Sequence, residues 1–304
     1  MPLKLIGAGL GRTGTASTRK GLQLLGLTKV YHFHEIRGSP NQEELFLKWI
    51  QAFQLKEQNR ITECKAILYE LVNDYDATLD HPACHFYKEL GEMYPEAVIL
   101  LNLRDSHESY VKSVSNTIGK IAELVSSNRY QMVGNFCPIS PTFKELGRYF
   151  WTMPGVEFHN KVFTDPTYLE KYYEWWNAKV INECPSDRLW IFNVKQGWEP
   201  ICRALKIEKP SFSFPYVNTT ETMRQNINRL QKVLYGIYVI ILSIFVLFSS
   251  EHANVFSFGY DGALVLITLL LAFKYVILPL GNMKQVMDFR NSERSVIEEK
   301  EKNL

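Results

Sequence analysis

Short apolar runs alternate with segments in which apolar residues recur at helical spacing, from residue 3 to about residue 194. The runs predict strands and the intervening segments predict helices. Expected strands cover residues 3–7, 30–33, 77–80, 97–103 and 189–194. Expected helices cover residues 15–25, 42–56, 83–93, 107–124, 141–150 and 167–181. This alternation is typical of an α/β protein, in which helices flank both faces of a parallel sheet to give three layers.

The pattern changes at the carboxyl end of the chain. Residues 221–232 are polar, residues 233–250 are uncharged, and a second apolar run at 263–280 carries one charge, Lys274. Each run has about the length that spans a bilayer core, so together they predict a linker and a transmembrane helical hairpin over 221–282. A buried hairpin in a soluble protein is the alternative. The loop between the runs lacks Lys and Arg, which predicts that residues 1–220 and the charged tail at 283–304 both face the cytosol.

A glycine-rich turn follows the first expected strand. Its glycines are Gly9, Gly11 and Gly14, and hydroxyl residues open the next helix. Glycine lets a backbone approach a ligand closely, and the free amides at a helix N-terminus favour an anion. The turn therefore predicts a phosphate or sulfate site formed by Gly11, Arg12, Thr13, Gly14, Thr15, Ala16 and Ser17.

Three nucleotide-binding interpretations compete for this turn. The spacing of its glycines fits a dinucleotide fingerprint, which also needs an acidic residue about 20 positions later; Glu35 is the candidate, after a segment too polar for a buried strand. A Walker A loop would need lysine where Thr15 stands, which disfavours ATP chemistry. The third interpretation places the cation inside the loop, at Arg12.

Three strand ends carry candidate functional groups. Arg12 follows the first strand, Asp80 ends the third and Arg104 follows the fourth. Ligands of open α/β sheets bind at the carboxyl ends of the strands, so we expect these side chains to meet. Two cations and one carboxylate suit a phosphorylated donor and a nucleophilic acceptor.

Longer segments match a known family in order. They are Leu79–Leu90 (LDHPACHFYKEL), Met93–Asp105 (MYPEAVILLNLRD), Pro185–Leu189 (PSDRL), Gly197–Cys202 (GWEPIC) and Phe214–Asn218 (FPYVN). With the glycine turn, these segments resemble the P-loop sulfotransferases. They look like one branch of that superfamily, common in fungi and invertebrates, which includes a flatworm drug-activating sulfotransferase.

The resemblance implies a reaction and a donor. Sulfotransferases move a sulfuryl group from 3′-phosphoadenosine 5′-phosphosulfate to a hydroxyl or amine of a small acceptor, without a metal. It implies that Asp80 is the catalytic base and that Arg12 stabilises the transferred group and the leaving phosphate. Arg104 and Ser113 would hold the 3′-phosphate; because their interval is one residue longer than usual in the family, Ser109 is an alternative. Residues 126–166 would form a variable cap over the acceptor. A nucleotide-binding scaffold without catalysis and an NAD(P)-dependent oxidoreductase are the other candidate functions.

Composition and charge indicate which classes of partner and ligand to expect. A net charge of +2 without a basic stripe argues against nucleic acid. The five cysteines show no paired-ligand spacing and are expected as reduced thiols. His81, Cys84 and His85 fall on adjacent helical positions, but a zinc site needs further ligands elsewhere, so we expect no metal there and interpret them as helix surface.

Overall fold

A computed structural model describes residues 2–36, 39–127, 140–155, 162–217 and 220–253, with only the backbone of residues 222, 226 and 242–253. The second apolar run, the charged tail and parts of the expected cap lie outside the described residues.

Five parallel strands form the sheet, in the order β2-β3-β1-β4-β5. They are β1 (Leu5–Gly7), β2 (Val30–Tyr31), β3 (Ala77–Thr78), β4 (Val98–Asn102) and β5 (Leu189–Phe192). Leu5 of β1 lies opposite Ala77 on one side and Val98 on the other, so the strand before the glycine turn is central. The sheet confirms the predicted α/β architecture, and each strand is shorter than its apolar run.

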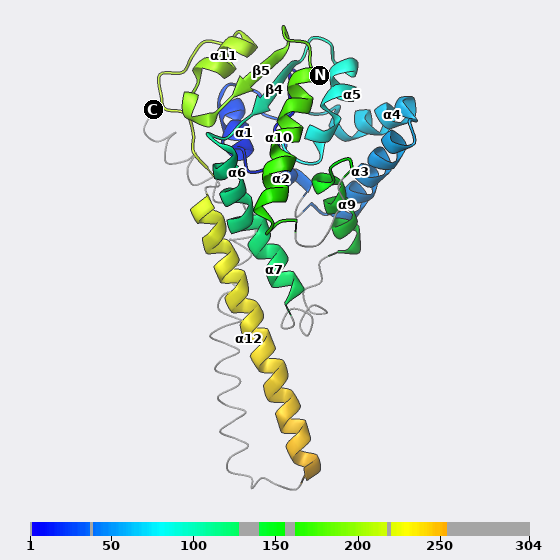
Figure 1. Ribbon diagram of the computed structural model, residues 1–304, viewed down its shortest axis with the longest axis vertical. Helices are drawn as coiled ribbons and strands as arrows, with labels where there is room; N and C mark the ends of the chain where they lie inside the picture. Colours follow the sequence, from blue (N-terminus) through cyan, green and yellow to red (C-terminus); the bar gives the residue numbers. More distant parts are fainter. Residues whose placement is uncertain (1, 37–38, 128–139, 156–161, 218–219, 254–304) are drawn as a thin grey trace. The chain divides into compact units, whose positions relative to one another are not determined.

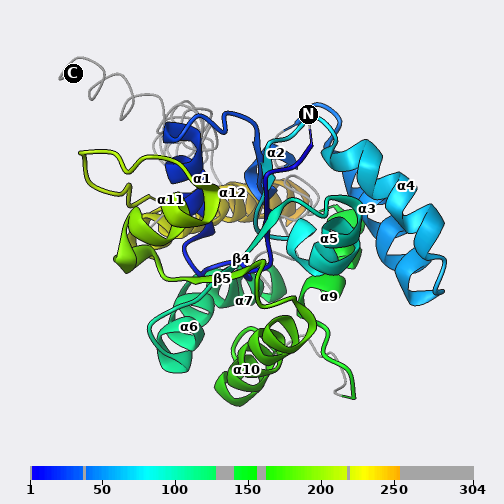
Figure 2. The ribbon, with the colours of Figure 1, turned by 90° about the horizontal axis from the view of Figure 1, so that it is seen from above.

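The two faces of the sheet bury different side chains of the same strands. Ile6, Ile99 and Leu101 belong to the larger hydrophobic cluster, whereas Leu5 and Leu100 belong to the smaller one. This alternation has the two-residue period of a strand that is covered on both sides. Figure 2 shows α1 (Thr15–Leu24) and α11 (Glu199–Leu205) on one side of the sheet, and α6 (His107–Val114) and α10 (Pro166–Glu183) on the other.

The structure describes further helical elements, which are drawn in Figure 1. They are α2 (Phe33–Ile36), η1 (Ala83–Phe86), α3 (Gln42–Glu57), α4 (Ile61–Val72), α5 (Tyr87–Met93), η2 (Ser115–Gly119), α7 (Lys120–Ser126), α9 (Pro141–Trp151), η3 (Val194–Gln196) and α12 (Thr220–Ala253).

Two helix starts follow local capping rules. The Asp165 side chain accepts from the amides of Thr167 and Tyr168 at the start of α10, and Ser106 and Ser109 form a capping box on α6.

Four segments differ from the sequence prediction. Residue 33, expected to end a strand, begins the short helix α2, and α4 was not expected. The helix expected at 107–124 is divided by the π-helical turn η2, where the Thr117 hydroxyl donates to the carbonyl oxygen of Ser113 at 2.6 Å. Residues 221–232, expected as a linker, are helical and continuous with the first apolar run in α12.

The chain divides into two compact units, Met1–Gly119 with Ser140–Thr220 and Lys120–Ile139 with Glu221–Leu304. In the second unit, buried Leu234 of α12 packs against Leu124 and Val125. Considering only the residues that the structure describes, we find no helix whose length and apolar content would carry it across a bilayer. The transmembrane hairpin is therefore not confirmed.

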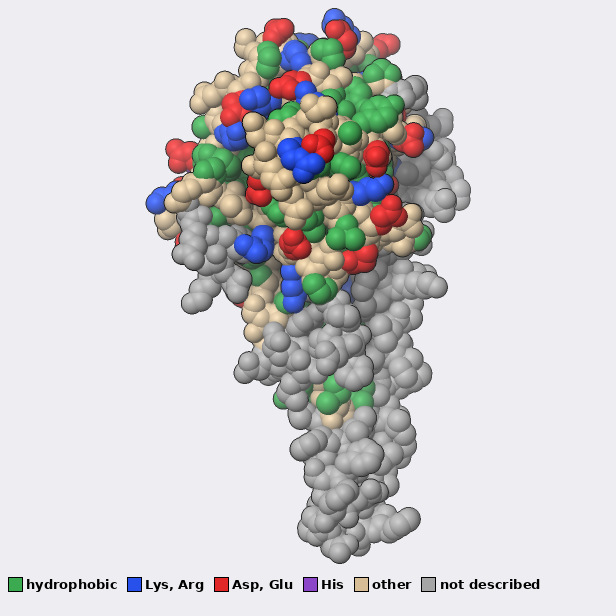
Figure 3. Space-filling model, turned by 90° about the vertical axis from the view of Figure 1, so that its right-hand side faces the viewer, with side chains coloured by type: hydrophobic (Ala, Val, Ile, Leu, Met, Phe, Trp, Pro, Cys, Tyr) green, Lys and Arg blue, Asp and Glu red, His purple; other side chains and the backbone are tan. Residues whose placement is uncertain are grey.

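Charges of both signs are interspersed on the surface drawn in Figure 3, where Lys and Arg side chains lie among Asp and Glu. This face carries no continuous basic area among its coloured side chains, in line with the nearly neutral net charge of +2.

Candidate active site

The glycine turn joins β1 to α1 through two residues with positive φ. Arg12 has φ 70° and Gly14, directly before the helix, has φ 97°. A Cβ on Gly14 would lie 2.5 Å from Val194 Cγ1, so this position requires glycine for both space and conformation. The first intrahelical bond runs from the Thr18 amide to the Gly14 carbonyl oxygen. The amides of the preceding first turn have no acceptor within the helix and can bind an anion.

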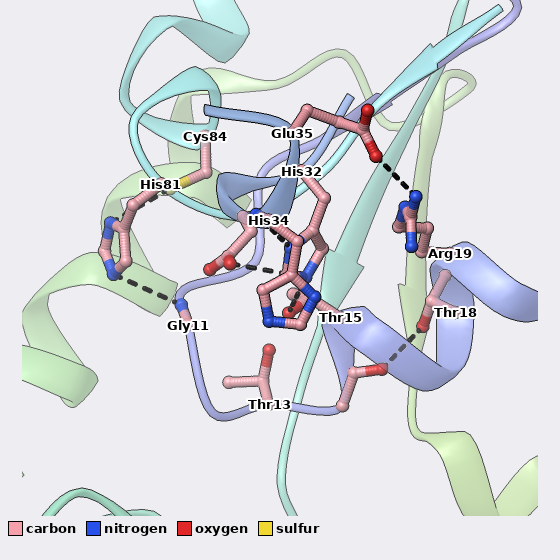
Figure 4. Close-up of polar contacts among 12 residues, drawn as sticks. Gly11, Thr13, Thr15, Thr18, Arg19, His32, His34, Glu35, His81 and Cys84 are labelled. Atoms are coloured by element: carbon pink, nitrogen blue, oxygen red, sulfur yellow. Dashed lines mark hydrogen bonds and ion pairs between the residues drawn. The ribbon is translucent and has the colours of Figure 1, made fainter. Parts of the chain in front are cut away.

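His81, in the segment after β3, contacts the glycine turn. The Gly11 amide donates to His81 Nε2 at 3.3 Å, as the dashed line in Figure 4 shows. A Cβ on Gly11 would lie 2.9 Å from Asp80 Oδ1, so glycine allows the turn to pass directly beside this carboxylate. The glycine turn and the segment after β3 are therefore in direct contact.

Arg12 and Arg104 come together as the strand ends predict, and Ser113, which the family resemblance implies, lies with them. Arg104 Nε donates to the Arg12 carbonyl oxygen at 2.7 Å, and Arg104 Nη2 donates to Ser113 Oγ at 2.7 Å. Arg12 Nε donates to the same Ser113 Oγ at 3.4 Å. Burial, and then the nearby Arg104, lower the pKa of Arg12 to about 10. Two partly buried guanidinium groups that share one hydroxyl form a site suited to an anion.

The structure separates the two candidate serines. Ser113 contacts Arg104, whereas the Ser109 hydroxyl donates to the Ser106 carbonyl oxygen at 2.8 Å within the capping box of α6. The interval that left Ser113 in doubt is accommodated by α6, which places Ser113 on the side facing Arg104.

Three hydroxyls near the turn are engaged by the protein itself. Thr13 Oγ1 donates to the Leu10 carbonyl oxygen at 2.6 Å, which closes the turn. Ser17 Oγ accepts from the Val217 amide at 3.0 Å. Thr220 Oγ1 lies 3.5 Å from Arg12 Nη2. The FPYVN segment and the residue that opens α12 thus contact the anion-binding groups, a relation that the sequence pattern did not indicate.

Asp80 is a buried carboxylate beside the turn, with 7% of its surface exposed and φ 66°. Its Oδ2 lies 3.3 Å from His32 Nε2. Its Oδ1 is buried and has no hydrogen-bond partner among the described residues. Burial raises the pKa of Asp80 from its ordinary 3.8 to about 6, while a hydrogen bond from the His81 backbone and the charge of Arg12 act in the opposite direction. A carboxylate with this pKa and one free oxygen suits a general base near neutral pH.

His81, Cys84 and His85 form a buried hydrogen-bonded cluster. His81 Nδ1 lies 2.9 Å from His85 Nε2 and 3.6 Å from Cys84 Sγ. Burial lowers the pKa of His81 to about 3 and raises that of the Cys84 thiol. The interpretation of these residues as helix surface is therefore wrong. All three are buried, their potential ligand atoms lie within 4.8 Å of one another, and His81 supports the glycine turn.

Other sequence motifs have structural partners. The Arg188 guanidinium of the PSDRL segment donates to the carbonyl oxygens of Gly91, Tyr94 and Ala97, which ties α5 to the sheet. Trp176 Nε1 donates to the Ala8 carbonyl oxygen at 2.8 Å, directly before the glycine turn. Trp176 therefore supports the strand that leads into the site, whereas Arg188 acts at the opposite end of the sheet, where β4 and β5 begin.

Sequence reasoning gave no firm role to two residues that the structure brings to the site. His32 bridges Thr15 and Asp80, and the Tyr173 hydroxyl accepts from the Arg104 amide at 2.8 Å. His32 directly follows β2, so its place at a strand end was a usable signal. Tyr173 lies in the middle of α10 and offered none.

The acidic residue needed by the dinucleotide interpretation is engaged elsewhere. Glu35 forms an ion pair with Arg19 of α1 (Figure 4). The expectation that the segment before Glu35 is too polar for a buried strand is wrong, because Val30 and Tyr31 form the buried parallel strand β2. The ion pair with Arg19 is what disfavours the dinucleotide interpretation.

Comparison with known proteins identifies the family. Residues 4–223 match the family model described as a sulfotransferase domain. The chain is also similar to Ava biosynthesis cluster protein M of Aspergillus versicolor, with 29% identity over 235 residues that cover 72% of this chain and 82% of that protein. The family model matches more than half of the chain and includes the glycine turn, Asp80, Arg104 and Ser113. The chain therefore belongs to the sulfotransferase domain family.

Proposed function

We propose that this protein transfers a sulfuryl group from 3′-phosphoadenosine 5′-phosphosulfate to a hydroxyl or amine of a small acceptor, and releases adenosine 3′,5′-bisphosphate. Membership of the sulfotransferase domain family supports sulfuryl transfer in general. The resemblance to the fungal and invertebrate branch rests on the sequence segments alone. The choice of donor and the roles of single residues come from the family resemblance, and the geometry of the site supports them.

The groups around the turn fit a donor that carries two separate anions. The free amides that open α1, with the Thr15 hydroxyl, suit the 5′-phosphosulfate. The Arg104–Ser113 pair, 2.7 Å apart, suits the 3′-phosphate. Arg12 contacts Ser113 and belongs to the turn, so it can serve both anions and neutralise charge on the leaving oxygen. A nucleotide without a 3′-phosphate would leave the second group unused.

Asp80 would accept the proton of the acceptor. The donor supplies the sulfuryl group: a bond forms between sulfur and the acceptor oxygen or nitrogen, and the bond from sulfur to the 5′-phosphate oxygen breaks, with its electron pair leaving on that oxygen. The acceptor proton goes to Asp80 Oδ1, the carboxylate oxygen without a partner among the described residues. No metal ion is needed for this balance.

One observation carries the proposal: a buried carboxylate, one oxygen of which has no hydrogen-bond partner among the described residues, lies beside a glycine turn whose arginine meets Arg104 and Ser113. This combination favours an enzyme over a scaffold protein, because a scaffold would need only the anion-binding groups and not a carboxylate beside them. The nicotinamide alternative has no comparable support, because Glu35 is engaged by Arg19.

The test is transfer of labelled sulfuryl from the donor to a panel of small alcohols and amines by the purified full-length protein. Asp80→Asn should bind adenosine 3′,5′-bisphosphate like the wild type but transfer at least about a hundredfold more slowly. The matched control is Asp76→Asn. Asp76 is also buried and lies at the opposite end of β3, where it accepts from the Lys29 amide at 3.0 Å. Normal transfer by Asp80→Asn would refute the role of Asp80. If the wild-type protein transfers no sulfuryl group to any acceptor of the panel, the proposal is refuted.

We also propose that the two apolar runs at 233–250 and 263–280 anchor the protein in a lipid bilayer, with the sulfotransferase domain on the cytosolic side. The support is the length of each run and the absence of Lys and Arg between them. The measurement is retention of the full-length protein in membranes washed at alkaline pH. Release into the wash would favour a buried hairpin instead.

A further inference from the structure

His32 occupies a buried position between the anion-binding turn and the candidate base. His32 directly follows β2 in the chain, and 2% of its surface is exposed. His32 Nε2 lies 3.1 Å from Thr15 Oγ1 and 3.3 Å from Asp80 Oδ2. Figure 4 shows the ring of His32 reaching toward Thr15 at the start of α1. One ring nitrogen is therefore within reach of both functional groups.

The contact of the other ring nitrogen of His32, Nδ1, determines which nitrogen carries the imidazole proton. His32 Nδ1 accepts from the His34 amide at 3.3 Å, so this nitrogen must carry a lone pair. Burial, and then the neighbouring His34, Arg19 and His81, lower the pKa of His32 well below its ordinary value. The ring is therefore neutral near pH 7, and its single proton lies on Nε2, which faces Thr15 and Asp80.

We infer that His32 is a positioning residue that couples the donor-binding turn to the catalytic base. Its Nε2–H holds Asp80 Oδ2 and leaves Oδ1 for the acceptor proton. The inference rests on the proposed function, since it takes Asp80 as the base. His32 itself does not touch either substrate in this account.

Because Thr15 and Asp80 share the proton on His32 Nε2, the state of one residue affects the other. A single N–H cannot donate fully to two oxygens, so Thr15 and Asp80 compete for it. When the Thr15 hydroxyl donates to a bound anion, its oxygen still has lone pairs that can accept from His32. Occupation of the turn thus changes how strongly His32 holds Asp80. This gives a physical route by which donor binding adjusts the basicity of the carboxylate.

Other charged or titratable groups also surround this chain of contacts. They are Arg12, Arg19, Tyr31, His34, His81, Cys84 and Tyr110. None of them is altered in the variants below, so a change in the behaviour of Asp80 reports on His32.

The test compares two substitutions of similar size in the full-length protein. His32→Leu removes the donor. His32→Gln keeps an N–H at the place of Nε2. A hydrogen bond to the ionised carboxylate lowers its pKa, so its removal raises the pKa of Asp80. His32→Leu should lower kcat about tenfold or more and move the acidic limb of the pH–rate profile to higher pH, with acceptor KM within about twofold. His32→Gln should recover most of the rate and the original limb.

A second readout is independent of turnover. The pKa of the Asp80 carboxyl, followed by NMR in protein labelled at the aspartate carboxyl carbon and assigned with Asp80→Asn, should be higher in His32→Leu than in the wild type. If the wild type transfers no sulfuryl group but this pKa rises as expected, the proposed function fails and the contact between His32 and Asp80 stands. An unchanged Asp80 pKa, or equal loss of rate in both substitutions, overturns the inference.

Discussion

Ser113 Oγ lies 2.7 Å from Arg104 Nη2, nine residues after the arginine along the chain. If this pair binds the 3′-phosphate, Ser113→Ala removes one hydrogen bond to a charged group. We expect a loss of about tenfold or more in affinity for adenosine 3′,5′-bisphosphate. Affinity for adenosine 5′-phosphosulfate, which lacks the 3′-phosphate, should change little. Calorimetric titration with both nucleotides measures the difference.

Ser109→Ala is the matched control for this prediction. The Ser109 hydroxyl takes part in the capping box of α6 and has no contact with Arg104. The substitution should cost up to about 1 kcal/mol of stability and leave nucleotide affinity unchanged. If Ser109→Ala weakens binding as much as Ser113→Ala, the assignment of the 3′-phosphate site is wrong.

A substitution in the glycine turn should separate backbone strain from steric conflict. Gly14→Ala adds a Cβ at φ 97° that would lie 2.5 Å from Val194 Cγ1. Gly26→Ala has nearly the same backbone angle, φ 91°, with nothing within 4 Å of the added carbon. Both should lose about 1 kcal/mol of unfolding free energy from strain, but only Gly14→Ala should also lose bisphosphate binding. Adding Val194→Ala to Gly14→Ala should recover part of the binding. If Gly26→Ala impairs binding equally, the turn has no special role.

The pKa of Asp80 predicts the acidic limb of the pH–rate profile. A base must be ionised to accept a proton, and burial raises the pKa of this carboxyl to about 6. Below that pH, kcat/KM should fall about tenfold per pH unit, and above it the rate should level off. An acidic limb near pH 4, as for an exposed carboxyl, would show that Asp80 is not the base.

The same pKa predicts that Asp80 costs stability at neutral pH. Its pKa is higher in the folded protein, about 6, than the ordinary 3.8 of an unfolded chain, so the folded state binds the proton more tightly. As pH rises from about 4 to 6, the unfolded chain loses this proton while the folded protein still holds it, so the free energy of unfolding falls by up to about 3 kcal/mol. Asp80→Asn should therefore gain stability relative to the wild type at pH 8 but not at pH 4. Denaturant unfolding at the two pH values measures this, and a constant difference would contradict it.

The sequence predicted the framework well because the sheet is buried on both faces. Most strands are apolar runs, although β2 comes from a segment that is polar by sequence, and Arg12, Asp80 and Arg104 follow from the rule that ligands bind at strand ends. The boundaries were less predictable. Phe33 continues an apolar pattern yet begins α2, and the π-helical turn at Ser115–Gly119 has no sequence signature of its own.

The contacts that join distant segments could not be predicted. His81 lies 70 positions from Gly11, and Thr220 lies 208 positions from Arg12, so only the packed fold brings them together. The burial of His81, Cys84 and His85 was missed for the same reason. Their spacing is also that of an exposed helical face, and it is the aromatic side chains of Phe150 and Trp176 that cover the two histidines.

The central claim is that the glycine turn binds a nucleotide carrying a 5′-phosphosulfate and a 3′-phosphate. A crystal structure of the protein with adenosine 3′,5′-bisphosphate tests it most directly. We predict the 5′-phosphate at the amides that open α1 and the 3′-phosphate at Arg104 and Ser113. A nucleotide bound elsewhere, or a turn that stays empty at saturating bisphosphate, would contradict the account.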